Sequence, residues 1–270
     1  MFTLRQYLLA LLDSRGLTRT LGEIDVCRDE QGRPCFSAGN SAAVFRIRLG
    51  GRIRSLRCYL RPMRHLKEIY GQRLLEKELY LHTSPETGVW VDTVLGDWIE
   101  GSTLHETVAQ AAALRDRESL QILVRLFDRL ALALVTDDRA HGDLKPENII
   151  VGDDGTLCPI DFDASYLPAF AGEISPELGT AAYQHPARTA ADFDERIDDY
   201  PAALISTTLH ALAEDPTLWD RYGSSDGLLY TPQRIASDPA YRETLALFEK
   251  RGMAVQYRIA QLLTAPTLRL

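Results

Sequence analysis

The stretch His141–Val151, which reads HGDLKPENIIV, constrains the fold of this chain more than any other feature. It places an acid, Asp143, and an amide, Asn148, just before a short apolar run. A turn sequence, DDG, and a second short apolar run follow, and Asp161 comes next. Two short apolar runs joined by such a turn are typical of a β-hairpin. The sequence therefore predicts a hairpin with chemically active side chains at its ends.

The bulk composition favours a folded, acidic protein. The 270 residues are 45% hydrophobic and 25% charged, which is enough to bury a sizeable core. The net charge of -8 argues against a general binder of nucleic acid or of an anionic membrane surface. A basic cluster lies between residues 46 and 67, but few aromatic side chains interleave with it. We therefore expect solvated sheet edges and a solvated helix face there, and no nucleic-acid partner.

Cysteine usage and the N-terminus both favour a cytoplasmic protein without a membrane segment. The 4 cysteines are scattered and form no C-x-x-C pair, so neither a zinc site nor a disulfide framework is expected. Such cysteines fit a reducing compartment. The apolar run at residues 7–12 is too short for a membrane span and lacks a signal-peptide cleavage site. Its apolar residues share one helical face, which predicts an amphipathic helix packed on the domain or on a partner.

The chain divides into a strand-rich part and a helix-rich part. Residues 23–60 and 89–99 show the pattern of short strands with turns. The expected helices cover residues 63–82, 103–113, 120–135, 201–213 and 241–263. We therefore expect an α+β, two-lobed fold. A helical extension at 1–22 would precede a β-rich N-lobe at 23–99 and a larger, mostly helical C-lobe at 100–270.

The residues around the predicted hairpin have the chemistry that phosphoryl transfer requires. That reaction needs a carboxylate beside the attacking hydroxyl, oxygen ligands for Mg²⁺ and groups that stabilise the phosphates. Asp143 is the candidate base or hydroxyl-orienting group, and Lys145 can neutralise the γ-phosphate. Asn148 and Asp161 are the candidate magnesium ligands.

These residues also resemble a known family. HGDLKPENIIV is similar to the catalytic loop H-R-D-L-x-x-x-N of the protein kinase superfamily, with Gly142 in the place of the arginine. Asp161-Phe162-Asp163 resembles the family's D-F-G motif, with Asp163 in the glycine position. The resemblance implies a bilobal kinase fold, binding of ATP and Mg²⁺, and transfer of the γ-phosphate to a Ser/Thr hydroxyl of a protein. It also implies that no arginine at position 142 is available to bind a phosphorylated activation loop.

The likeness extends into the N-terminal part of the chain and implies its nucleotide-binding residues. Ser37, Gly39, Ala42 and Val44 fall on the spacing of the family's glycine-rich loop. Arg57 takes the position of the phosphate-binding lysine, and its bulkier planar head could hold the phosphates differently. The expected carboxylate partner lies on the predicted 63–82 helix, where Glu78 fits the family pattern slightly better than Glu76. The segment 95–101, which contains Asp97 and Ile99, resembles the adenine-binding hinge.

Two further stretches resemble kinase landmarks. Residues 179–187 are similar to the end of an activation segment, G-T-x-x-Y-x-x-P-E, although Ala187 replaces the final glutamate. Residues 198–201 parallel the start of the family's central helix, where Asp198 would brace the catalytic loop. These landmarks favour a protein kinase of the bacterial Ser/Thr type.

Two other functions stay open at this point. A pseudokinase scaffold would explain Arg57, Asp163, Ala187 and the glycine-poor phosphate loop. A small-molecule kinase would explain the HGD triplet and the Ile160–Asp163 stretch, which resemble aminoglycoside phosphotransferases. The expected partner is accordingly a protein substrate or a small-molecule hydroxyl acceptor.

Overall fold

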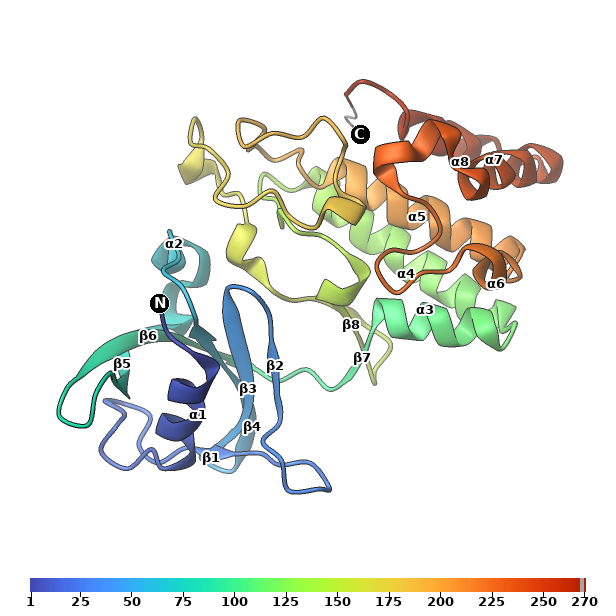
Figure 1. The fold of residues 1–270 in the computed structure, drawn as a ribbon. Coiled ribbons are helices and arrows are strands. Elements are labelled where there is room, and N and C mark those ends of the chain that lie inside the picture. The colour runs from blue at the N-terminus through green and yellow to red at the C-terminus, as the bar shows by residue number, and fades with distance from the viewer. Residues whose placement is uncertain (268–269) are drawn as a thin grey trace. The chain divides into compact units, whose positions relative to one another are not determined.

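The N-terminal unit is built on one antiparallel sheet. The computed structural model describes residues 1–267 and 270, which form two units, Met1–Trp98 and Ile99–Leu270 (Figure 1). The six-stranded sheet has the order β1-β3-β4-β6-β5, with β2 paired to β3. The strands are β1 (Asp25–Val26), β2 (Phe36–Ala38), β3 (Ala42–Leu49), β4 (Arg52–Tyr59), β5 (Leu74–His82) and β6 (Gly88–Asp97). The expected strand-rich N-terminal part is therefore confirmed.

The N-terminal amphipathic helix packs against this sheet. Helix α1 (Leu4–Leu12) begins with a capping box, in which the side chains of Thr3 and Gln6 satisfy each other's backbone amides. Tyr7 and Leu11 are fully buried in the core that the sheet residues also form. The Tyr7 hydroxyl donates to the carbonyl of Tyr59 at 2.6 Å, so the buried phenol has a partner. The predicted packing of the helix on its own domain is confirmed.

The predicted helix over residues 63–82 is wrong. Helix α2 (Leu66–Tyr70) has only 5 residues, and strand β5 occupies most of the remainder. Gly71 ends the helix with φ 53° and ψ -123°, a backbone that glycine adopts readily. Beyond it, Leu79 and Leu81 are buried while His82 is exposed, which is the two-residue period of a strand. The apolar residues of the two segments together imitate one helical face.

The C-terminal unit is mostly helical, with a small sheet of order β7-β8-β9. Its helices are α3 (Leu104–Ala113), α4 (Arg117–Thr136), α5 (Asp199–Glu214), α6 (Leu218–Tyr222), α7 (Pro239–Arg251) and α8 (Ala254–Leu262). Its strands are β7 (Gly101–Thr103), β8 (Ile149–Gly152) and β9 (Leu157–Pro159). Short 3₁₀ turns in the chain cover Gly71–Arg73, Pro146–Asn148, Phe162–Ala164, Pro168–Phe170, Ala181–Tyr183 and Pro232–Ser237. The α+β fold class inferred from the sequence is thus confirmed.

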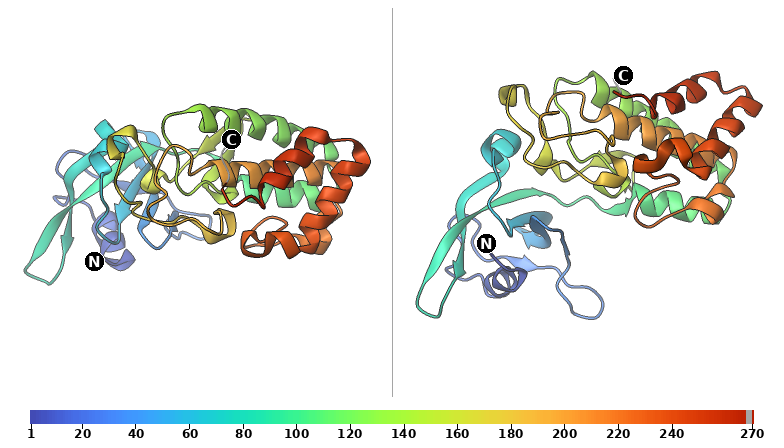
Figure 2. Two further views of the ribbon diagram at one scale, coloured as in Figure 1. Left: turned by 90° about the horizontal axis from the view of Figure 1, so that it is seen from above. Right: turned by 45° about the horizontal axis from the view of Figure 1, so that its top comes forward.

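Helix α5 is the centre of the helical unit. It contacts α4, α7 and α8, and Figure 2 shows this helical group from two further directions. Leu204, Ile205 and Leu209 of α5 are buried in the same core as Phe127 of α4 and Phe248 of α7. The predicted continuous segment 241–263 is instead two helices. Gly252, with φ 69°, is the left-handed C-cap that ends α7.

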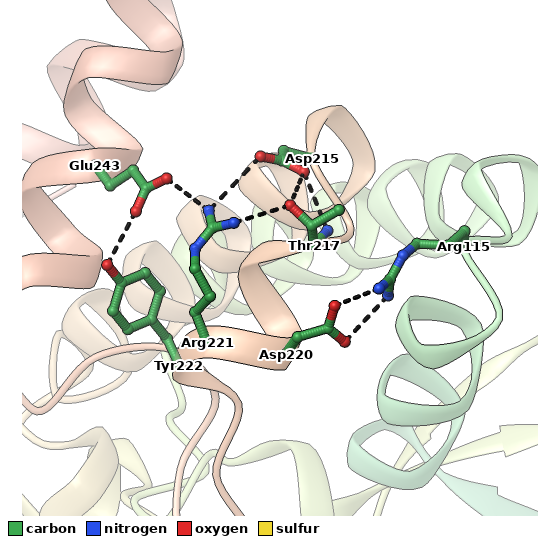
Figure 3. Close-up of polar contacts among 7 residues, drawn as sticks. All are labelled: Arg115, Asp215, Thr217, Asp220, Arg221, Tyr222 and Glu243. Atoms are coloured by element: carbon green, nitrogen blue, oxygen red, sulfur yellow. Dashed lines mark hydrogen bonds and ion pairs between the residues drawn. The ribbon is translucent and has the colours of Figure 1, made fainter.

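Polar contacts join the outer helices of this unit (Figure 3). Arg221 of α6 forms ion pairs with Glu243 of α7 at 2.5 Å and with Asp215 at 3.8 Å, and Tyr222 donates to Glu243 at 3.0 Å. In the same region Arg115 pairs with Asp220. These pairs are partly exposed, so each contributes modestly, but together they tie α6 to its neighbours. Across residues 1–267 and 270, no helix combines the length and hydrophobicity needed to cross a membrane.

Candidate active site

The β8–β9 hairpin brings Asn148 and Asp161 to the same end of two paired strands. Ile149 is paired with Pro159, and Val151 with Leu157. The pairing extends one residue further, because the amide of Ile160 donates to the carbonyl of Asn148 at 2.9 Å. Asp161 follows Ile160 directly. The predicted hairpin is confirmed, and it places the two candidate magnesium ligands next to each other in the fold.

Asn148 is tied to Asp143. The 3₁₀ turn Pro146–Asn148 returns the chain toward the loop, and the Nδ2 group of Asn148 donates to the backbone carbonyl of Asp143 at 2.9 Å and to its Oδ2 at 3.3 Å. Asn148 is buried. Because the amide nitrogen is used in these bonds, Oδ1 is the atom of Asn148 that remains suited to a cation. Such an oxygen is a ligand that Mg²⁺ prefers.

The carboxylate of Asp143 is held from two sides. The amide of Thr180 donates to Oδ1 at 2.5 Å, and the ammonium of Lys145 lies 3.3 Å from Oδ2. Lys145 also donates to the Thr180 hydroxyl at 2.8 Å. The side chains of Asp143 and Lys145 are only 17% and 23% exposed, so these interactions are partly shielded from water. Thr180 is therefore part of the site. In the sequence, the Gly179-Thr180 pair at the start of the kinase-like stretch 179–187 was the feature that indicated this position.

His141 and Phe162 connect the loop to the segment after β9. The His141 Nε2 donates to the carbonyl of Ile160 at 2.7 Å, and its ring lies 5.0 Å from that of Phe162, centroid to centroid. Asp161, between Ile160 and Phe162, has φ 68° and ψ 62°. This left-handed backbone is uncommon for a residue other than glycine and concentrates at functional sites. Local contacts therefore fix the backbone on both sides of Asp161.

The buried carboxylate of Asp198 holds the backbone of the loop that precedes Asp143. Asp198, at the start of α5, is 1% exposed and accepts hydrogen bonds from the amides of His141 and of Gly142, the latter at 3.0 Å. Burial raises the pKa of the Asp198 carboxyl, whereas the nearby His141 and the two amides act in the opposite direction. The brace expected from the sequence is present.

The backbone conformation and the close packing at position 142 require a glycine. Its φ is 81°, and a Cβ atom at this position would lie 2.0 Å from the carbonyl oxygen of Ala164. No L-residue fits such a contact without movement of the backbone. The departure from the kinase loop at this position is therefore a consequence of how closely the two segments approach.

The candidate phosphate-loop residues lie on one hairpin. Ser37 is paired with Val44 in the β2–β3 register, and the amide of Gly39 donates to the carbonyl of Ala42 at 2.9 Å across the turn. Arg57 of β4 is paired with Val44 on the other side of β3. The sheet thus brings all five of these residues together.

Glu78 is engaged elsewhere. It lies on strand β5, is 1% exposed, and its Oε1 accepts the amides of Arg19, Thr20 and Leu21 at 3.1, 2.8 and 2.9 Å. Its Oε2 accepts the Thr20 hydroxyl at 2.6 Å. The expectation that Glu78 lies on a helix is wrong, because it lies on strand β5, where its carboxylate organises the 19–21 loop. Its role as the partner of Arg57 stays a prediction. Glu76, the other candidate, is exposed and pairs with Lys67 at 3.3 Å.

The hinge residues occupy the end of β6 and the chain just after it. Asp97 is paired with Arg54 in the β4–β6 register, and their side chains form an ion pair at 3.4 Å. Ile99 is the first residue of the C-terminal unit and is partly buried. Asp97 therefore has a structural partner within its own sheet.

Comparison with known proteins gives partial matches to Ser/Thr protein kinases. CBL-interacting protein kinase 17 of Oryza sativa subsp. japonica is 28% identical over 172 residues, which are 60% of this chain and 35% of that protein. Serine/threonine-protein kinase PknL of Mycobacterium tuberculosis is 34% identical over 113 residues, 40% of this chain and 27% of the relative. Serine/threonine-protein kinase chk1 of Schizosaccharomyces pombe is 25% identical over 160 residues, 57% of this chain and 31% of the relative.

The matches span between 27% and 35% of these relatives' own lengths. No protein-family model matches the chain. The partial likenesses support a distant relationship to the protein kinase superfamily.

Proposed function

We propose that this chain is an ATP- and Mg²⁺-dependent phosphotransferase that transfers the γ-phosphate to a Ser/Thr hydroxyl of a protein. The observation that carries the proposal is the arrangement around Asp143. Its carboxylate contacts Lys145, Asn148 and Thr180, and Asn148 shares one end of a hairpin with Asp161. Distant likeness to Ser/Thr protein kinases supports the same reaction class.

The donor set at the hairpin end fits Mg²⁺. Asn148 would offer its Oδ1 and Asp161 its carboxylate, both oxygen ligands, and substrate phosphates and water would complete the coordination. When bound, the ion neutralises charge on the phosphates. Asp143 would orient the acceptor hydroxyl and accept its proton, while Lys145 would stabilise negative charge on the transferred group. Within the N-terminal unit, Arg57 and the β2–β3 turn are the candidate phosphate-binding groups.

The acceptor segment favours a polypeptide substrate. Residues 172–186 include Thr180, which contacts both Asp143 and Lys145. If Asp143 is the base, this segment would border the position of the acceptor hydroxyl. A segment ordered against the base provides a platform for an extended peptide, whereas a small acceptor needs an enclosed pocket. The four cysteines are free, which fits the cytoplasmic location that we also propose.

One observation favours a second candidate, a pseudokinase that binds nucleotide or a partner without turnover. Glu78 is occupied by the 19–21 loop, and α2 has only 5 residues. The carboxylate that the kinase resemblance assigns to Arg57 is therefore missing from its expected helix. An arginine in the place of the phosphate-binding lysine would bind nucleotide in a different way.

Transfer from labelled ATP tests the proposal. The wild-type chain is assayed with and without Mg²⁺ on a generic protein acceptor, on itself and on a panel of aminoglycosides, beside Asp143→Asn and Asp161→Asn. We expect Mg²⁺-dependent labelling of protein that falls about 10²–10⁴-fold in Asp143→Asn. Thermal stabilisation by ATP without transfer would establish the pseudokinase. Labelling of the aminoglycosides alone would show that the acceptor is a small molecule and not a protein.

A further inference from the structure

Both backbone polar groups of Gly142 are held by side chains, the amide by Asp198 and the carbonyl by Arg188. Its amide donates to Oδ1 of Asp198 at 3.0 Å. Its carbonyl accepts a hydrogen bond from Nη1 of Arg188 at 3.1 Å. Hydrogen bonds to charged partners are stronger than neutral ones. Gly142 directly precedes Asp143, so this pair of contacts fixes the backbone from which the candidate base projects.

Burial of the Arg188 guanidinium is energetically unfavourable. Among the residues that the structure describes, its Nε and Nη2 are buried without a hydrogen-bond partner, and Nη1 also donates to Gln184. Burying unpaired donors of a cation is unfavourable, and an apolar side chain of similar size would avoid that cost. Burial lowers the pKa of Arg188, while the carboxylates of Asp198 and Asp143 oppose this shift. The carboxylates of Asp198 and Asp143 thus favour the charged form of Arg188.

Position 142 cannot supply such a cation itself. A side chain there would meet the Ala164 carbonyl, since the Cβ atom alone would lie 2.0 Å from that oxygen. The positive charge beside the loop comes instead from Arg188, 46 residues further along the chain. Buried Asp198 gains a nearby charge of opposite sign, which a buried carboxylate needs.

We propose that Arg188 is a positioning residue for Asp143. It holds the Gly142 carbonyl and so fixes the peptide that precedes the candidate base, and it brings to the loop the positive charge that position 142 cannot carry. This inference rests on the proposed function, because the positioning matters for transfer only if Asp143 acts in it.

The test compares Arg188→Leu, Arg188→Lys and the control Arg115→Leu, which removes a cation from the Asp220 pair in the same unit. Two quantities are measured: amide hydrogen exchange at Gly142 and Asp143 relative to amides of buried α5 residues, and kcat and KM for ATP. We expect Arg188→Leu to accelerate exchange at the loop by roughly tenfold or more while the α5 amides change little. Its kcat should fall roughly 10- to 100-fold at an unchanged KM. Arg188→Lys should recover part of both, and Arg115→Leu should match wild type.

Three outcomes would overturn the inference. These are unchanged loop exchange in Arg188→Leu, equal acceleration in the loop and in α5, or the same effect in Arg115→Leu. Absence of transfer in the wild-type protein would instead remove the proposed function. In that case the exchange ratio still decides whether Arg188 holds the loop.

Discussion

The amide of Thr180 donates to Oδ1 of Asp143 at 2.5 Å, which ties the segment 172–186 directly to the candidate base. The two residues are 37 positions apart in sequence, and Lys145 contacts both. A change at Thr180 should therefore be felt in the transfer step.

Thr180→Ala removes the hydroxyl that Lys145 binds but keeps the amide bond to Asp143. We expect kcat to fall roughly tenfold, because a hydrogen bond to a charged group is lost while the base stays in place. Thr189→Ala is the control, since the exposed Thr189 hydroxyl binds Asp192 and the amide of Ala191 and contacts neither Asp143 nor Lys145 in the described residues. Steady-state phosphate transfer measures both variants. Equal rates in wild type and Thr180→Ala would show that Lys145 does not depend on this hydroxyl.

Glu78→Ala should destabilise the N-terminal unit. Four hydrogen bonds from the 19–21 loop to the carboxylate are lost, while the Arg19 amide keeps its bond to the Glu78 carbonyl. We expect the free energy of unfolding to drop by about 3 kcal/mol. Glu76→Ala, which removes an exposed carboxylate paired with Lys67, should change it by less than about 1 kcal/mol. Urea denaturation compares the two. A stable Glu78→Ala protein with weakened ATP binding would instead make Glu78 the partner of Arg57.

Gly142→Ala should be far more costly than Gly155→Ala. Both glycines have positive φ, near 80°, so each alanine pays about 1–2 kcal/mol for the left-handed backbone. At Gly155 a Cβ meets nothing within 4 Å among the described residues, whereas at Gly142 it overlaps the Ala164 carbonyl. We expect an additional loss of about 1–3 kcal/mol at Gly142. Thermal melts of the two variants give the difference, and equal melting temperatures would refute the close approach.

The ion pair at the end of α4 gives a pH dependence. Hydrogen bonding from Arg139 lowers the pKa of Asp137 to about 2, below its ordinary value of 3.8. Because the pKa is lower in the folded state, the ionised carboxyl stabilises the fold at pH values above the unfolded-state pKa. This stabilisation is lost as the pH falls toward about 2. Asp137→Asn should therefore be slightly less stable than wild type at pH 6, by under about 1 kcal/mol because the pair is exposed. The difference in melting temperature should vanish between pH 4 and pH 2, and a constant difference would exclude the ionic origin.

The hairpin and its flanking residues could be predicted from the sequence because the pattern that defines them is local. Turn residues, apolar runs and the spacing from Asp143 to Asn148 all belong to 23 consecutive residues, 141–163. The same holds for α1 and α4, whose apolar faces are regular and whose N-caps are Thr3 and Asp116. Such elements follow from patterns within single segments.

The part that the sequence did not give depends on contacts between distant segments. The helix expected over 63–82 failed because Gly71 interrupts it and because β6 offers β5 a strand partner, which no periodicity within 63–82 reports. Glu78 took a role with residues 57 to 59 positions away. Arg188 entered the site only through folding, since its partner Gly142 lies 46 residues away. Tertiary pairing overrides local preference in these places.

The contact between Gly142 and Ala164 has an evolutionary consequence. A lineage that carries it cannot accept an arginine at position 142 in one mutational step, since the 3₁₀ turn Phe162–Ala164 must first withdraw. The order of substitutions is thereby constrained, because a change in the 162–164 turn has to precede any side chain at position 142.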